Sequence, residues 1–204
     1  MADIIIFSGF AGSGKGTVFD LAKEKHPALW KSVSMTTRAP RPGEVEGLHY
    51  FFVSKEEFLE TLREDGFLEH AEYCENYYGT PRKKLFEMQE KGFVPVLEIE
   101  TVGAEQAMAR LERFRSVFIA PPNFKTLEAR LRGRGTETES AVQKRLSAAK
   151  EELEKLRLYE FVLVNRDGAA AETAEVLWEV IETGKTDSSL LVQDKEAFIS
   201  QFFE

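Results

Sequence analysis

Short apolar runs and amphipathic stretches follow one another along most of the chain. Residues 4–7 read Ile-Ile-Ile-Phe, a run that is typical of a buried strand. Because each such run is followed by a helical pattern, the order predicts a parallel sheet with helices on both of its faces. Strands are expected over residues 3–8, 31–34, 49–53, 67–74, 93–99, 116–120 and 161–164, and helices between residues 17 and 27 and over 54–64, 81–91, 102–111, 123–131, 136–158 and 169–183.

Residues 49–80 interrupt this alternation. Their strands have the pattern of antiparallel pairs, so we interpret this region as an insertion into the parallel sheet. Capping signals mark the helices beside it. Ser54 and Glu57 form a capping box. Residues 76–81 predict a turn, in which Thr80 followed by Pro81 predicts an N-cap with proline at the first helical position. Farther along the chain, Thr136 and Glu139 form a second capping box.

The composition narrows the class of protein. At 204 residues, with 43% apolar and 30% charged residues, the chain is an ordinary globular protein. Its formal net charge of −8 argues against broad binding to nucleic acid or anionic membranes. No apolar run is long enough for a signal peptide or a membrane span, and Cys74 is the single cysteine, so we expect a cytoplasmic protein without disulfides. The choice between monomer and homo-oligomer stays open.

A glycine-rich turn separates the first strand from the first helix. Its glycines can adopt positive φ angles, and its N–H groups can then surround an anion at the N-terminus of the helix. A lysine in the turn adds a charge for the β- and γ-phosphates. The turn therefore predicts a phosphate-binding P-loop, for which the alternative is a chance glycine-rich connection. Its residues are Gly9, Phe10, Ala11, Gly12, Ser13, Gly14, Lys15, Gly16 and Thr17.

The P-loop departs at one position from the usual spacing G-x-x-x-x-G-K-[ST]. Gly9, Gly14 and Lys15 match, but Gly16 occupies the position of the hydroxyl residue and Thr17 follows it. We therefore expect Mg²⁺ to be held largely through water and phosphate oxygens, with Thr17 as a weak ligand.

Two further stretches carry candidate chemistry. Residues 34–44 contain two prolines and a glycine, which predicts an exposed loop. Arg38 and Arg41 in this loop allow two interpretations, a solvated basic turn or a pair of guanidinium groups that clamp a phosphate. Farther along, Glu69 shares a strand face with Phe67, and a carboxylate in apolar surroundings needs a partner.

Two long segments resemble the guanylate kinase family. The first resembles its GMP-binding region and includes Ser34, Thr37-Arg38, Pro40-Arg41, Gly43-Glu44, Gly47, Tyr50 to Ser54, Gly66 to Glu69 and Tyr78-Gly79-Thr80. The second resembles its lid region and includes Phe118 to Pro122, Arg130, Gly133 to Glu139 and Lys144 to Ala149. The likeness extends from about residue 3 to residue 183, and a match of this length, in order, is highly specific.

The resemblance implies a P-loop kinase with a three-layer α/β fold, formed as a single guanylate-kinase-like domain over residues 1–204. It implies reversible transfer of the γ-phosphoryl group of ATP to GMP, and to dGMP, in purine nucleotide metabolism, with Mg²⁺ as cofactor. The parts would be a core with a parallel sheet (1–33, 82–125 and 150–183), a GMP-binding insertion with antiparallel strands (34–81), a mobile helical lid (126–149) and a C-terminal tail of unknown role (184–204).

The resemblance also implies roles for single residues. Catalysis would fall to Lys15, Arg38, Arg134 and Arg145. ATP would be bound by the P-loop together with Arg130, Arg134 and Asn165. GMP would be bound by Ser34, Arg38, Arg41, Tyr50, Glu69, Tyr78, Thr80, Glu98 and Glu100. Glu69 would read guanine, because a carboxylate can accept hydrogen bonds from both N1–H and the exocyclic amine.

Two departures from the family pattern leave alternatives open. Lys15-Gly16-Thr17 resembles the adenylate kinase version of the P-loop, which suggests a kinase for another nucleoside monophosphate, although Glu69 speaks against it. Glu100 replaces an aspartate that the family usually carries, and Glu98 could compensate. A second alternative is a non-catalytic module like the guanylate-kinase-like domains of membrane-associated scaffolds, which usually lack an intact P-loop.

The tail from residue 184 lies outside the resemblance. Residues 193–203 predict a short helix with an apolar face that includes Phe198, Ile199, Phe202 and Phe203. We expect this face to pack on the core or on a neighbouring subunit. Docking of a partner is the weaker interpretation.

Overall fold

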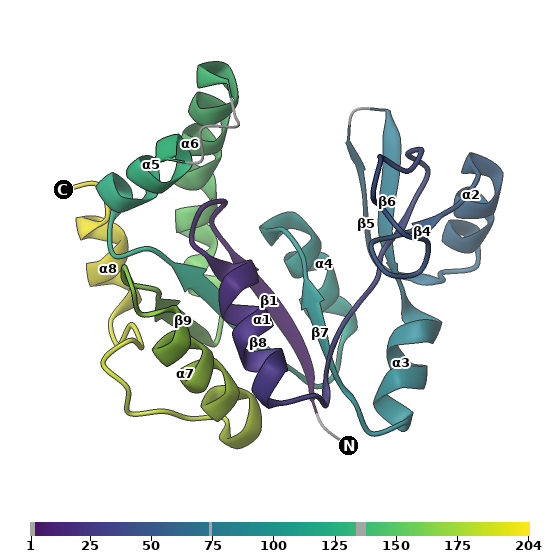
Figure 1. Ribbon diagram of the computed structural model, residues 1–204. Helices are drawn as coiled ribbons and strands as arrows, with labels where there is room; N and C mark the ends of the chain where they lie inside the picture. The colour runs from purple at the N-terminus through teal and green to yellow at the C-terminus, as the bar shows by residue number, and fades with distance from the viewer. Residues whose placement is uncertain (1–2, 74, 134–137) are drawn as a thin grey trace. The chain divides into compact units, whose positions relative to one another are not determined.

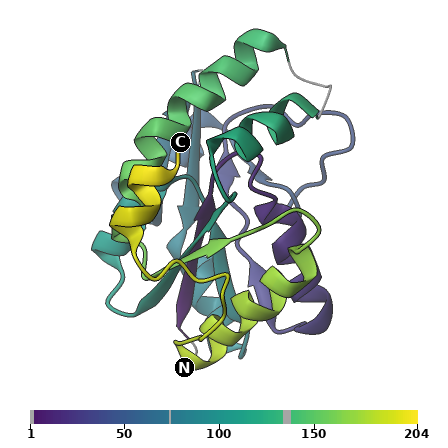
Figure 2. The same ribbon diagram turned by 90° about the vertical axis from the view of Figure 1, so that its left-hand side faces the viewer.

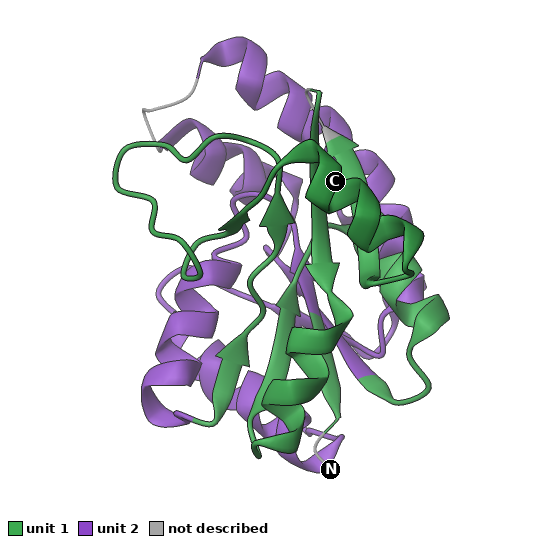
Figure 3. Ribbon diagram, turned by 90° about the vertical axis from the view of Figure 1, so that its right-hand side faces the viewer, with its two compact units in different colours: residues 1–6, 28–114 green, residues 7–27, 115–204 purple. Residues whose placement is uncertain are grey.

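The structure is a computed structural model that describes residues 3–73, 75–133 and 138–204. The chain divides into two compact units (Figure 3), residues 1–6 with 28–114 (unit 1) and residues 7–27 with 115–204 (unit 2). One sheet has the strand order β2-β7-β1-β8-β9, and a second has the order β4-β3-β6-β5. Together with their helices, these sheets confirm the predicted α/β class with a parallel sheet and a second, mixed sheet.

The first sheet is built from the apolar runs that the sequence predicts as strands. β1 (Ile4–Gly9) is buried from Ile4 to Ser8. β2 (Leu29–Lys31) pairs in parallel with β7 (Val94–Glu98) in unit 1. β8 (Phe114–Ala120) pairs in parallel with β9 (Phe161–Val164), and Val117 lies opposite Phe161. Parallel strands of this kind are buried on both faces, which explains why they read as continuous apolar runs.

Unit 1 contains the second sheet and its small apolar core. The strands are β3 (Met35–Thr36), β4 (Phe51–Phe52), β5 (Phe67–Tyr73) and β6 (Asn76–Pro81), and β6 runs antiparallel to both β3 and β5. Phe58 and Phe67 stack with ring centroids 4.4 Å apart and form a cluster with Met35. The helices of this unit are α2 (Lys55–Arg63), α3 (Arg82–Glu90) and α4 (Thr101–Arg110), labelled in Figure 1.

Unit 2 contains the remaining helices. α1 (Lys15–Lys25) packs against α7 (Ala170–Thr183). α5 (Phe124–Gly133) and α6 (Glu139–Glu154) also contact each other, and a 3₁₀ turn (Lys155–Leu158) follows α6. None of the helices in the described part of the chain combines the length and apolar character that crossing a membrane needs.

The C-terminal tail packs on unit 2 and ends in α8 (Lys195–Gln201), drawn in yellow in Figure 2. Leu191 forms an antiparallel bridge with Leu163 at the edge of β9. The ring of Phe202 stacks on that of Phe10 with centroids 5.2 Å apart, and the main-chain N–H of Phe124 donates to the carbonyl of Phe202 at 2.8 Å. The predicted short helix is therefore confirmed, and its apolar face packs on the core of its own chain.

Several predicted elements and boundaries are wrong. Residues 76–81 form strand β6 instead of a turn, because pairing with β3 and β5 overrides the turn-forming composition around Gly79. As a result Pro81, and not Thr80, is the N-cap of α3. β2 ends at Lys31, where the prediction began, and Met35–Thr36 belongs to a strand although a loop was expected from residue 34.

The helix expected from residue 136 begins at Glu139. Thr138 is its N-cap and accepts a hydrogen bond from the N–H of Ala141. Thr136, the predicted cap, lies outside the described residues. At α2 the predicted N-cap is confirmed, since the hydroxyl of Ser54 accepts a hydrogen bond from the N–H of Glu57 at 3.1 Å.

Candidate functional site

The P-loop has the backbone of an anion-binding turn. Gly12 and Gly14 have φ angles of 91° and 82°, in the left-handed region that favours glycine. Gly14 is the N-cap of α1, and no side chain forms a capping hydrogen bond there. The first turn of α1 also contains no acidic residue. The N-terminus of this helix therefore keeps a positive potential that suits a phosphate.

Three glycines of the loop are required by their surroundings. A Cβ atom at Gly9 would lie 2.5 Å from the carbonyl oxygen of Ile119, and one at Gly14 would lie 2.6 Å from Nδ2 of Asn165. A Cβ atom at Gly12 would lie 3.1 Å from Cδ2 of Leu131. Larger residues at these positions would displace the loop from the core of unit 2.

The fourth glycine of the loop, Gly16, has open space around it, with no atom within 4 Å of a Cβ placed there. Its identity is therefore not imposed by packing. Thr17, the next residue, is exposed on the first turn of α1. Lys15 is the first residue of the helix and is half-buried. Phe10 is buried, and Ala11 is half-buried at the turn.

The hydroxyl of Ser13 is buried and has no hydrogen-bond partner among the described residues. A buried hydroxyl without a partner is costly unless a ligand or water satisfies it. Ser13 lies inside the loop, where its N–H donates to the carbonyl of Phe10 at 3.0 Å. The chemistry of this position fits a bound anion, whose oxygens would accept from the hydroxyl.

Two side chains of unit 2 support the loop. Nδ2 of Asn165 donates to the carbonyl of Ser13 at 2.8 Å, and Oδ1 of Asn165 accepts from the hydroxyl of Thr173 at 3.3 Å. Arg130 donates to the same carbonyl of Ser13 at 3.2 Å, and its Nη2 lies 2.7 Å from Oδ1 of Asp167. Asn165 is 4% exposed, so its contacts position the loop, while a contact with adenine stays a prediction.

A cavity of about 390 Å³ lies beside Arg130 in unit 2. Most of its lining residues belong to α5, and at the start of this helix the side chain of Asn123 accepts from the N–H of Thr126 at 2.9 Å. The lining residues are Asn123, Lys125, Thr126, Ala129, Arg130 and Asp167. A cavity of this volume is of the size that small-molecule sites have.

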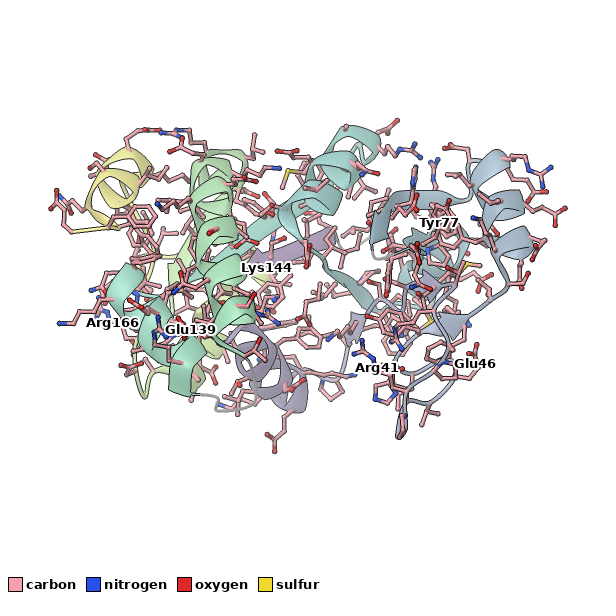
Figure 4. The ribbon with its side chains drawn as sticks, turned by 90° about the horizontal axis from the view of Figure 1, so that it is seen from above. Arg41, Glu46, Tyr77, Glu139, Lys144 and Arg166 are labelled. Atoms are coloured by element: carbon pink, nitrogen blue, oxygen red, sulfur yellow. The ribbon has the colours of Figure 1, made fainter. Side chains whose placement is uncertain are left out.

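Arg134 and Arg145 fall in the region that the family resemblance assigns to a lid. Arg145 is exposed on α6. Arg134 lies outside the described residues. Figure 4 shows Glu139 and Lys144 on the same helix α6, and Arg132 of α5 forms an ion pair with Glu139 at 2.5 Å. Charged side chains therefore line both helices.

In unit 1, Arg38 is held by a bidentate ion pair. Its Nη1 and Nη2 atoms donate to the carboxylate of Glu44 at 3.0 and 2.8 Å, and this pairing lowers the pKa of Glu44 to about 2. The same carboxylate accepts from the main-chain N–H of Arg41 at 2.7 Å. Two guanidinium N–H groups directed at one pair of oxygens have the geometry that also binds a phosphate.

Aromatic rings surround the guanidinium group of Arg38. It lies 5.5 Å from the ring centroid of Tyr50 and 5.9 Å from that of Phe52. Tyr50 and Tyr78 contact each other edge to face at 6.0 Å. Arg41 is exposed on the loop between β3 and β4, which also carries Glu46 (Figure 4). The structure thus brings Arg38, Tyr50 and Tyr78 together.

Glu69 and Thr80 form the most buried polar pair of this sheet. The hydroxyl of Thr80 donates to Oε1 of Glu69 at 2.6 Å. Thr80 is 1% exposed and Glu69 is 7% exposed. Burial raises the pKa of Glu69, the hydrogen bonds from Thr80 oppose this shift, and the charge of Glu100 adds to it. A buried carboxylate with one partner has unused acceptor capacity for a ligand.

Ser34, Glu98 and Glu100 also belong to unit 1, and the charge of Glu100 acts on Glu69. Ser34 precedes β3, and its carbonyl accepts from the N–H of Phe51 at 2.9 Å. Glu98 ends β7 and forms an ion pair with Lys31 at 2.5 Å. Glu100 is exposed and is the N-cap residue of α4, without a capping hydrogen bond from its side chain.

Sequence reasoning overlooked three residues that the structure places against the candidate site. Asp167 holds Arg130, and Glu44 holds Arg38, although neither was singled out as a binding residue. Gly103 lies inside α4 next to the carboxylate of Glu69. A glycine in the first turn of a predicted helix was the available signal for Gly103, because glycine weakens a helix.

Among the described residues, no group of three or more His, Cys, Asp or Glu side chains is placed to hold a metal ion. The hydroxyl-bearing residue next to the loop is Thr17, exposed on the first turn of α1, and a single hydroxyl fits an ion such as Mg²⁺ that binds chiefly to phosphate oxygens and water.

Comparisons with known proteins show which family the chain resembles. A family model described as guanylate kinase matches residues 1–183. A guanylate kinase from Synechococcus sp. (strain CC9311) is 48% identical over 162 residues, which are 79% of this chain and 85% of that protein. One from Trichormus variabilis is 46% identical over 168 residues, 82% of this chain and 84% of that protein. The crystal structure of guanylate kinase from Anaplasma phagocytophilum, 33% identical, matches with a TM-score of 0.68 over 98% of this chain and 95% of that chain.

Proposed function

The chain belongs to the guanylate kinase family, and from this premise we propose that it transfers the γ-phosphoryl group of ATP to GMP, giving ADP and GDP. The reaction would be reversible, and dGMP would serve as a second acceptor. The single observation that carries this proposal is the buried pair of Glu69 and Thr80, which offers a carboxylate to a base.

ATP would bind to unit 2. The N-terminus of α1, without a side-chain cap, and the unpartnered hydroxyl of Ser13 suit the triphosphate. Lys15 would follow the β- and γ-phosphates with its ammonium group. Arg130 and Asn165 would keep the loop in its binding conformation through the carbonyl of Ser13. The cavity beside Arg130 would receive the adenine base.

GMP would bind to unit 1. Arg38 would grip the 5′-phosphate together with Arg41, Tyr50 and Tyr78, and the phosphate would replace Glu44 as the partner of the guanidinium group. Ser34 and Thr80 would add hydrogen bonds at the base, and Glu98 and Glu100 would lie near it. Glu69 would accept from N1–H and the exocyclic amine of guanine.

Adenine offers neither donor in that arrangement and would leave the carboxylate of Glu69 unpaired. The cost of such an unpaired buried group is roughly 1–3 kcal/mol, and more for a charged one. This difference favours GMP over AMP, and it speaks against a kinase for another nucleoside monophosphate.

Phosphoryl transfer depends on positioning and on neutralising charge more than on covalent chemistry. Lys15 and Arg38 would each hold one of the two reacting phosphates. Arg145 and Arg134 of the lid region would stabilise the charge on the transferring group, and closure of the lid would exclude water. These roles keep the γ-phosphate from being lost to hydrolysis.

We propose Mg²⁺ as the cofactor, bound with ATP. When bound, it would neutralise charge on the β- and γ-phosphate oxygens. Thr17 is the hydroxyl-bearing residue of the P-loop helix that could contribute a weak ligand, directly or through water. The location we propose is the cytoplasm, in keeping with a chain that has a single cysteine and uses ATP.

An assay for ADP release with GMP, dGMP, AMP, UMP and CMP as separate acceptors tests the proposal. We expect ADP formation with GMP and dGMP and little with the other three. Release of ADP with AMP or a pyrimidine nucleotide at a similar rate would show a different monophosphate kinase. Binding of GMP without any ADP release would show a non-catalytic module.

A further inference from the structure

The strand that carries Glu69 is irregular at that residue. Phe67 lies opposite Pro81 and His70 lies opposite Gly79, so the register between β5 and β6 shifts by one residue between these pairs. Three steps along β5 therefore match two steps along β6, which defines a β-bulge that contains Leu68 and Glu69. A bulge re-aims the side chains at its position and weakens the local ladder. The direction of Glu69 must then be fixed by something besides strand pairing.

Helix α4 supplies this support on the other edge of β5 (Figure 1). Oε1 of Gln106 accepts from the main-chain N–H of His70 at 3.1 Å, and Nε2 of Gln106 donates to the carbonyl of His70 at 3.0 Å. Nη1 of Arg110 donates to the carbonyl of Phe67 at 2.9 Å. These contacts lie on either side of Glu69 in the sequence and satisfy backbone groups that an edge strand otherwise leaves unpaired.

The same face of α4 comes closest to Glu69 at Gly103. Residues 103, 106 and 110 are three and four positions apart and so share one side of the helix. A Cβ atom at Gly103 would lie 2.8 Å from Oε2 of Glu69 and 3.3 Å from its Cδ atom. Real Cβ atoms do not approach other atoms that closely, so the carboxylate occupies its present position only because residue 103 is glycine.

The carboxylate is thus confined from two sides. Thr80 binds Oε1 from strand β6, and the backbone of α4 at Gly103 limits the position of Oε2. Glycine is a poor helix former, so its place inside α4 lowers the stability of the helix in exchange for this space.

We propose that the face of α4 formed by Gly103, Gln106 and Arg110 sets the position of the Glu69 carboxylate and thereby the base specificity of the acceptor site. These are positioning residues, since they act through Glu69. The inference rests on the proposed function, because it concerns how the proposed guanine reader is held. A shift of this carboxylate breaks the simultaneous hydrogen bonds to N1–H and the exocyclic amine.

The test is Gly103→Ala, with Val102→Ala as the matched control on the exposed side of the same helix. Michaelis constants are measured for ATP, GMP and IMP, since the base of IMP keeps N1–H but lacks the exocyclic amine. We expect Gly103→Ala to raise KM for GMP at least about tenfold and to bring the GMP to IMP ratio of kcat/KM close to one. KM for ATP should stay unchanged. Val102→Ala should leave all three constants as in the wild type.

A melting curve separates this outcome from general damage. Alanine is the better helix former, so a folded Gly103→Ala protein should melt no lower than the control unless Glu69 cannot move aside. Gln106→Met, which keeps the length of the side chain but removes both hydrogen bonds to His70, provides a second variant. This variant too should lower the ratio of kcat/KM for GMP to kcat/KM for IMP, with no change in KM for ATP.

Three results would have different meanings. If the wild type released no ADP with GMP, the proposed function itself would fail. If the wild type used GMP, and both variants kept the wild-type ratio of kcat/KM for GMP to kcat/KM for IMP, the inference about α4 would be wrong while the proposed function stood. A rise in the KM values for ATP and GMP alike, with a lower melting temperature, would also overturn the inference, because it would show a general structural role.

Discussion

The hydroxyl of Thr80 donates a hydrogen bond of 2.6 Å to the carboxylate of Glu69 between two neighbouring strands of unit 1. Both side chains are almost completely buried. The contact stabilises the ionised carboxylate, while burial favours the protonated one, and burial is the larger effect on the pKa. The buried carboxylate of Glu69 would therefore be stabilised by a ligand that donates hydrogen bonds to it.

Replacement of Thr80 by valine removes the hydroxyl and keeps the shape of the side chain. Without this donor, the pKa of Glu69 should rise further, and the carboxylate should bind guanine less well. Loss of a hydrogen bond to a charged group is worth about 1.5–3 kcal/mol, so kcat/KM for GMP should fall by a factor of roughly 10 to 150. Steady-state kinetics measure this change. Thr61→Val, which removes a hydroxyl bonded to a carbonyl within α2, is the control and should have no such effect.

The pKa of Glu69 also predicts how activity depends on pH. Guanine donates to the ionised carboxylate, and the raised pKa means that Glu69 takes up a proton at a higher pH than an ordinary glutamate, whose value is 4.5. As pH falls through this raised pKa, kcat/KM for GMP should fall, because this parameter reports the free enzyme. Glu69→Gln should remove this acidic limb. A wild-type profile that stays flat down to the ordinary glutamate value would contradict the expectation.

The raised pKa of Glu69 also makes the stability of the folded protein depend on pH, and here low pH is favourable. A carboxyl whose pKa is raised by folding stabilises the folded protein most below its unfolded pKa, and this contribution is lost as pH rises through the folded pKa. Free enzyme at neutral pH therefore carries the cost of a buried charge, and hydrogen bonds from bound GMP would offset part of it.

Gly16 allows a direct test of how Mg²⁺ is held. No atom lies within 4 Å of a Cβ placed at this residue, so Gly16→Ser should fold without strain. The new hydroxyl would occupy the usual ligand position of the motif and should lower the Mg²⁺ concentration for half-maximal activity several-fold, an effect on the order of 1 kcal/mol. Activity at varied Mg²⁺ and constant ATP gives this value. Identical Mg²⁺ curves would show that binding through phosphates and water suffices.

Phe202 of the tail should support the P-loop. Its ring stacks on that of Phe10 and is 1% exposed. Deletion of a buried phenylalanine ring costs about 3–5 kcal/mol, which corresponds to a decrease in melting temperature on the order of 10 °C for a chain of this size. Phe202→Ala should also raise KM for ATP, since Phe10 belongs to the loop. Phe203→Ala, which removes a ring that is 44% exposed, should have a much smaller effect on both measurements.

The part of the fold with strong local patterns could be predicted from the sequence. The apolar run of β1 and the capping residues of α2 act locally, and the structure confirms both. β6 was missed because Gly79, Thr80 and Pro81 favour a turn, and pairing with two other strands outweighs that preference. Thr80 consequently binds a carboxylate instead of capping a helix.

The burial of the candidate guanine reader could be anticipated, but its support could not. Strand alternation places Glu69 among apolar neighbours, and the residue is indeed buried. The bulge arises from the pairing of β5 with β6, and Gly103 approaches Glu69 from a helix more than 30 residues farther along the chain, so no local pattern reports either feature. The same holds for Asp167, whose ion pair with Arg130 depends on tertiary structure.

The most direct measurement is a pair of equilibrium titrations, with GMP and with a non-hydrolysable ATP analogue, on the wild type, Lys15→Ala and Glu69→Gln. Lys15→Ala should bind the ATP analogue much more weakly and keep its affinity for GMP, whereas Glu69→Gln should lose affinity for GMP and keep that for the analogue. If each variant lost affinity for both nucleotides alike, the assignment of the donor site to the P-loop and of the acceptor site to the Glu69 sheet would be wrong.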